Sequence, residues 1–102
     1  MLYSSRDGMP IKSFRHKGLR QFFEEDNLRG IAAAQAEKLA DILAAIDAAN
    51  SVEEIGKFPG WRLHPLKGDL QGFWSVTVTG NWRLIFRFKN GEASELDLID
   101  YH

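Results

Sequence analysis

The feature that most constrains the fold is a pair of tight-turn signals in the second half of the chain. Gly80-Asn81 and Lys89-Asn90-Gly91-Glu92 are typical of β-hairpin connections, and Asn-Gly is the strongest short-range signal for one. Between the two turns, one row of side chains is predicted to share a sheet face: Trp82, Leu84, Phe86 and Phe88. Because successive strand residues point to opposite faces, a second row lies on the other side: Arg83, Ile85 and Arg87.

Three more segments are predicted to be strands of the same sheet. Trp61–Leu66 contains Pro65, which cannot donate a ladder hydrogen bond and therefore indicates an edge strand or a strand end. Phe73–Thr79 alternates between apolar and polar residues, and Ser94–Tyr101 follows the second turn. The carboxyl-terminal half is therefore predicted to form a four-stranded meander.

Two helical patterns precede these strands. From His16 to about Asp26, apolar residues recur at the spacing of one helix face: Leu19, Phe22 and Phe23. The alanine-rich segment Ile31–Ala49 carries a longer apolar stripe, which predicts a second helix: Leu39, Ile42, Leu43 and Ile46. Ser51 with Glu54 three residues later predicts one further, capped helical turn.

The order of these elements predicts an α+β domain. Pro10–Phe14 is expected to form a short amino-terminal strand, followed by two helices packed on one face of a small, mostly antiparallel sheet. The apolar row that begins at Trp82 then faces the helices. Arg83 is expected on the opposite, open face.

Composition limits the chain to a few classes. A chain of 102 residues has the size of one domain, here expected over residues 9–102, with residues 1–8 forming a flexible extension. It contains no cysteine, which excludes disulfides and thiolate zinc sites, and no apolar run long enough to span a membrane. A cytoplasmic protein without a membrane partner is expected. The histidines His16, His64 and His102 lie in separate segments, so no metal site is predicted.

The formal net charge of −1 conceals a polarised distribution. Residues 24–54 contain eight acidic and two basic residues, whereas residues 55–91 contain six basic and one acidic residue. A local anion-binding surface over the strands is therefore compatible with a nearly neutral total. On charge alone, an ordinary mixed surface remains the favoured alternative, because a basic balance over the whole domain is missing.

Three motifs resemble those of one toxin family. They are Leu63-His64-Pro65-Leu66-Lys67-Gly68, Gly80-Asn81-Trp82-Arg83 and the terminal Asp100-Tyr101-His102. Together they resemble the HigB branch of the RelE/ParE toxin superfamily, over nearly everything from Pro10 to His102. The resemblance implies a RelE-like fold and a toxin of a type II toxin-antitoxin system.

The resemblance also implies an activity and its residues. HigB-like toxins are ribosome-dependent endoribonucleases that cleave messenger RNA without a metal or other cofactor. By this resemblance Arg83 stabilises the charge on the phosphate, Lys67 and His102 transfer protons, and His64 supports them. Four further cations are expected to bind RNA: Arg62, Arg87, Lys12 and Lys17.

The partners implied by the resemblance are a HigA-like helix-turn-helix antitoxin, the ribosome and messenger RNA. Operator DNA is expected to be contacted only through the antitoxin. A base could stack on Phe73 or Trp74, although Trp74 shares the predicted core face and packing is its ordinary role.

Other roles remain open from the sequence. A strand arginine such as Arg83 is ordinarily a solvated surface residue, and His64 and Lys67 are ordinary loop residues outside the motif. Some relatives carry an arginine close to the position of Thr79, which leaves a cation missing here. The alternative functions are a ParE-like topoisomerase inhibitor and a catalytically weak module that only binds its antitoxin.

Overall fold

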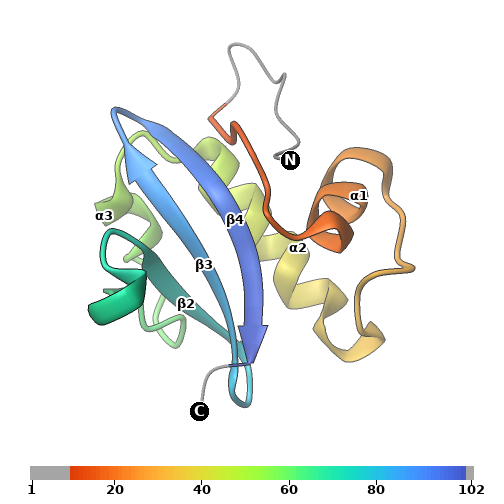
Figure 1. The fold of residues 1–102 in the computed structure, drawn as a ribbon. Helices are drawn as coiled ribbons and strands as arrows, with labels where there is room; N and C mark the ends of the chain where they lie inside the picture. The colour runs from red at the N-terminus through yellow and green to blue at the C-terminus, as the bar shows by residue number, and fades with distance from the viewer. Residues whose placement is uncertain (1–9, 101–102) are drawn as a thin grey trace.

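The computed structural model describes residues 10–100 and has helices on one face of an antiparallel sheet (Figure 1). The helices are α1 (Lys17–Glu25), α2 (Ala33–Ala48) and α3 (Val52–Ile55). The strands are β1 (His64–Pro65), β2 (Trp74–Thr79), β3 (Trp82–Lys89) and β4 (Glu92–Asp100), with a 3-10 turn, η1 (Gly68–Leu70), after β1. Within the described residues the sheet order is β1-β2-β3-β4, and each neighbouring pair is antiparallel. The predicted α+β class is confirmed.

The helix ends follow local chemistry. The ring Nδ1 of His16 accepts a hydrogen bond from the Leu19 backbone N–H at 3.0 Å and thereby caps α1. That helix ends at Asp26, which adopts a left-handed conformation with φ of 55°. At α3 the Ser51 side chain makes no cap, but the Glu54 carboxylate accepts from the Asn50 N–H at 2.8 Å. The predicted pairing of Ser51 with Glu54 therefore does not form, because Glu54 binds the residue before the N-cap instead.

The amino-terminal segment pairs with β4 but does not form the predicted strand. It makes two isolated parallel bridges, Ile11 with Ala93 and Phe14 with Leu96. Between them β4 is irregular: Glu95 has φ of 54°, and its N–H donates to the Ser13 hydroxyl at 2.9 Å instead of to a backbone carbonyl. The irregularity interrupts the ladder, so a continuous strand over Pro10–Phe14 is replaced by separate bridges.

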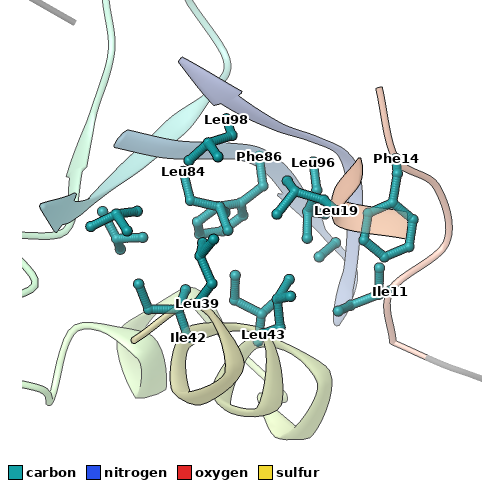
Figure 2. Close-up of a cluster of buried hydrophobic side chains, with 14 of the residues drawn as sticks. Ile11, Phe14, Leu19, Leu39, Ile42, Leu43, Leu84, Phe86, Leu96 and Leu98 are labelled. Atoms are coloured by element: carbon teal, nitrogen blue, oxygen red, sulfur yellow. The ribbon is translucent and has the colours of Figure 1, made fainter. Parts of the chain in front are cut away.

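The main core lies between α2 and the sheet (Figure 2). Leu39, Ile42 and Leu43 of α2 point toward the central strands, where Leu84 and Phe86 are fully buried. The remaining labelled members come from the amino-terminal segment, α1 and β4: Ile11, Phe14, Leu19, Leu96 and Leu98. The predicted apolar row of β3 is buried at its centre, whereas Trp82 at the strand end is 39% exposed.

The opposite sheet face is not fully open, which corrects the sequence-based expectation. Leu66, Phe73 and Ile85 form a second buried cluster there, with Leu70 and Ile99 packed against it. The β1–β2 connection folds back onto this face, because the Leu66 N–H donates to the Phe73 carbonyl at 2.9 Å. Alternation identified the face of Ile85 correctly but gave no information about what covers it.

Candidate active site on the sheet

Arg83 is held at the start of β3, on the face opposite the helices. It pairs with Thr77 of β2 and Ile99 of β4. Its Nη1 donates to the Gly80 carbonyl at 2.8 Å and to the Trp82 carbonyl at 3.1 Å, so the β2–β3 turn fixes the guanidinium. Among residues 10–100 no carboxylate forms an ion pair with it. The remaining guanidinium donors can therefore bind an anion such as a phosphate.

His64 lies on the same face, two strands away. It pairs with Ser75, which pairs in turn with Ile85, and directly paired residues share a sheet face. Its ring Nδ1 is 2.9 Å from the Arg62 carbonyl oxygen. Because a carbonyl can only accept, Nδ1 is the donor in this contact, and Nε2 has no hydrogen-bond partner among residues 10–100.

Lys67 follows β1 directly and is exposed. It occupies the residue before η1, where the loop turns over the second buried cluster. In the part of the chain that is described, its ammonium has no ion-pair partner. The loop therefore presents a free cation at the border of the face that carries His64 and Arg83.

The sheet register sets the spacing of these groups. Two strand spacings and two residues along a strand separate the Cα atoms of His64 and Arg83 by about 12 Å. His102 lies outside the described residues, and the last described residue, Asp100, pairs with Trp82 beside Arg83.

The predicted RNA-binding residues come from separate segments of the chain. Arg62 is exposed and adopts φ of 54° just before β1, and Lys17 is exposed at the first residue of α1. Lys12 lies beside Ala93, at the end of β4 opposite to that near Arg83, and its Nζ is 3.6 Å from a Glu92 carboxylate oxygen. Lys12 therefore lies away from Arg83, whereas the backbone of Arg62 directly contacts the His64 ring.

Arg87 has two partners on the sheet face. Its Nε is 3.1 Å from a Glu95 carboxylate oxygen, and its guanidinium carbon lies 4.4 Å from the centre of the Phe73 ring. Phe73 is only 3% exposed, so its ring is covered rather than offered to a base. Trp74 is half-buried against the main core.

Sequence reasoning missed Arg15, which approaches the same ring from the amino-terminal segment at 5.8 Å. Its neighbour Phe14 is buried in the core, and alternation after that residue is the only signal that could have placed Arg15 on the outer face.

Thr79 has a role at the helical layer. Its hydroxyl accepts a hydrogen bond from the Gln35 amide of α2 at 3.1 Å. The register of β2 against β3 shifts between Thr77 and Thr79, which turns this side chain toward α2. The position therefore ties the hairpin to α2 and does not contribute a polar group to the face of Arg83.

Two shallow hollows lie on the other side of the molecule, along the outer face of α2. Their volumes are about 340 Å³ and 550 Å³, and both are lined by Ala45 and Phe58. Phe58 is 43% exposed and stacks on Trp61 at a centroid distance of 4.2 Å. Neither hollow includes a predicted catalytic residue.

Among residues 10–100, no three His, Asp or Glu side chains gather in a group that could hold a metal ion. Over the same residues, the helices are too short or too polar to cross a membrane.

Comparison with known proteins identifies the class and then the family. Residues 12–102 match the family described as the RelE-like toxin of the type II toxin-antitoxin system HigB, so the chain is a RelE-like toxin. It is 47% identical over 92 residues to Endoribonuclease HigB of Proteus vulgaris, covering 90% of this chain and 99% of that protein. It is 35% identical over 81 residues to Toxin HigB-1 of Vibrio cholerae serotype O1, covering 78% and 85%. The chain belongs to the HigB-like toxin family.

Proposed function

We propose that this toxin is a ribosome-dependent endoribonuclease that cleaves messenger RNA and thereby inhibits translation. The observation that carries the proposal is the placement of His64 and Arg83 on one sheet face, with the exposed Lys67 in the loop that follows β1. The similarity to a protein named Endoribonuclease HigB over nearly the whole chain supports the same activity.

The proposed reaction is an intramolecular transfer at the phosphate. A base takes the proton from a ribose 2′-hydroxyl, and the resulting oxygen attacks the adjacent phosphorus. A bond from the 2′-oxygen to phosphorus forms, the bond from phosphorus to the 5′-oxygen breaks, and an acid protonates the departing 5′-oxygen. The products carry a 2′,3′-cyclic phosphate and a 5′-hydroxyl, and the chain's own groups supply every proton transfer.

The proposed roles are those that the resemblance implies, and the chemistry of each side chain supports them. Arg83 stabilises the negative charge that grows on the phosphate, because its guanidinium is fixed by the turn and pairs with no carboxylate among residues 10–100. Lys67 and His102 transfer protons, and the free Nε2 of His64 supports them. His102 lies outside the described residues, and Asp100, two residues before it in sequence, pairs with Trp82.

Ribosome dependence follows from the weak electrostatic capture of free RNA. The affinity of a protein for RNA grows with the number of phosphates it neutralises, and the cations here are few and dispersed. We propose that Arg62, Lys12 and Lys17 contact RNA on the ribosome, which presents the messenger to the sheet face. Such positioning can lower the barrier by about 7–11 kcal/mol in favourable cases.

The proposed partners follow from membership of a toxin-antitoxin family. A HigA-like helix-turn-helix antitoxin neutralises the toxin in the cytoplasm, and operator DNA is bound through that antitoxin only. No cofactor is proposed.

The test compares one messenger in two states. The purified, antitoxin-free protein is expected to cut messenger programmed on ribosomes rapidly and the same naked messenger hardly at all. Cleavage sites and rates are read by mapping the 5′ ends of the fragments over time at two salt concentrations. Equal rates in both states contradict ribosome dependence. Growth inhibition without cleavage in either state favours a ParE-like inhibitor of a topoisomerase.

A further inference from the structure

The loop that carries Lys67 is fastened to the sheet largely by side chains. β1 contributes only two residues, His64 and Pro65, to pairing with β2. From there the chain runs through η1 and returns at Phe73, whose N–H donates to the Leu70 carbonyl at 3.0 Å. The Phe73 ring is buried against Leu66 and Ile85, so this ring is the main anchor of the loop.

Arg87 covers that anchor from outside. Its guanidinium carbon lies 4.4 Å from the ring centre, which is within the range of a cation-π contact. Gly72 leaves the necessary room: it has φ of 97°, and a β carbon at this position would overlap Nη1 of Arg87. The absence of a side chain at Gly72, directly before Phe73, therefore lets Arg87 lie over the ring.

Glu95 holds the arginine in turn. Its carboxylate is 3.1 Å from Nε of Arg87, and its backbone is fixed at the β4 irregularity by the hydrogen bond to Ser13. The two side chains are 43% and 32% exposed, and an ion pair as exposed as this contributes little to global stability. What the pair fixes is the direction of the guanidinium over the ring.

We propose that Arg87 and Glu95 are positioning residues for RNA cleavage, which fix the loop so that Lys67 meets the phosphate bound by Arg83. This inference rests on the proposed endoribonuclease function. Arg87 then acts through Phe73 and not by binding RNA. Lys67 has no side-chain ion pair among residues 10–100 to fix it, so its position depends on how firmly the loop is held.

Glu95 separates this role from direct RNA binding by Arg87. If Arg87 positions the loop, Glu95→Gln releases the arginine and lowers kcat. If Arg87 binds a phosphate, the same substitution removes a competing carboxylate, strengthens RNA binding and lowers KM. The two roles therefore predict different kinetic constants to change.

The kinetic experiment measures kcat and KM for messenger programmed on ribosomes. Arg87→Met, which keeps an unbranched apolar cover over Phe73, and Glu95→Gln are each expected to lower kcat by about 10- to 100-fold with KM unchanged. The kcat of the double variant is expected to be no lower than that of the more impaired single variant, because both substitutions break the same contact between Arg87 and Glu95. Glu25→Gln is the matched control, since it removes the carboxylate of another exposed ion pair, that with Arg20 on α1, and it should leave kcat unchanged.

A second measurement needs no cleavage. Hydrogen-deuterium exchange on the isolated protein is expected to accelerate in residues 66–73 of both variants, while the amides of α2 keep their wild-type protection.

Faster exchange in α2 as well would mean global destabilisation and would overturn the positioning role. So would unchanged exchange in the loop, unchanged kcat, or a lower KM in Glu95→Gln. If the wild-type protein cleaves no messenger, the proposed endoribonuclease function is wrong. If the wild type cleaves messenger but the variants show unchanged exchange in the loop, only the positioning role is wrong.

Discussion

Arg83→Ala is expected to lower the rate of messenger cleavage on ribosomes by about 10²–10³-fold, the usual loss when one fixed donor to a developing oxyanion is removed. Among residues 10–100 the side-chain hydrogen bonds of Arg83 go to the carbonyls of its own turn, and it lies outside both buried clusters. The free energy of unfolding should therefore stay within about 0.5 kcal/mol of the wild-type value. Arg83→Lys should restore part of the rate, because it keeps the charge but loses the two-pronged donor geometry.

The measurement is a single-turnover rate together with a thermal melting curve. Lys89→Ala is the matched control, because Lys89 is an exposed cation at the other end of the same strand. It should cleave at the wild-type rate. A folded Arg83→Ala protein with wild-type cleavage would remove Arg83 from the site, and an unfolded one would assign it a structural role.

Deletion of His102 alone is expected to lower the cleavage rate by about 10²–10⁴-fold, the range for losing one proton-transfer group. The residues of β4 that contribute to the core remain in place: Ala93, Leu96 and Leu98. The melting temperature should therefore change little. Rate and melting curve are compared with those of a variant lacking Met1–Gly8, which carries no motif and should cleave normally. Wild-type cleavage without His102 would end its assignment.

Local chemistry explains which parts of the fold could be predicted. The two turns that flank β3 fixed its register, and the period of two placed Leu84 and Phe86 against the helices. The apolar stripe of α2 and the spacing within α1 identified both helices to within a few residues. Each of these signals lies within one element or one hairpin.

The rest depends on contacts between residues far apart in the chain. Ser13 interrupts the pairing of the amino-terminal segment by binding Glu95, and nothing near Pro10–Phe14 in sequence indicates this. The second buried cluster likewise needs the loop to return over Ile85. The contact of Arg87 with both Phe73 and Glu95 joins three segments, so strand alternation could place the arginine on a face but not assign its partners.

The motif resemblance identified the candidate site residues, and the pairing register of β1, β2 and β3 shows where two of them lie on the sheet. His64 and Arg83 share a sheet face through two antiparallel pairings, which sequence spacing alone does not show. Thr79 had suggested a missing cation, but its hydrogen bond to Gln35 shows a structural role at α2.

The most direct test of the central claim uses one altered nucleotide. A messenger is programmed on ribosomes with a single 2′-deoxyribose at the nucleotide that supplies the attacking oxygen, and cleavage at that site is compared with an all-ribose messenger. Attack by the 2′-hydroxyl predicts complete loss of cleavage at the altered site, with unaltered sites still cut and ending in a 2′,3′-cyclic phosphate. Cleavage at the deoxy position would contradict the mechanism.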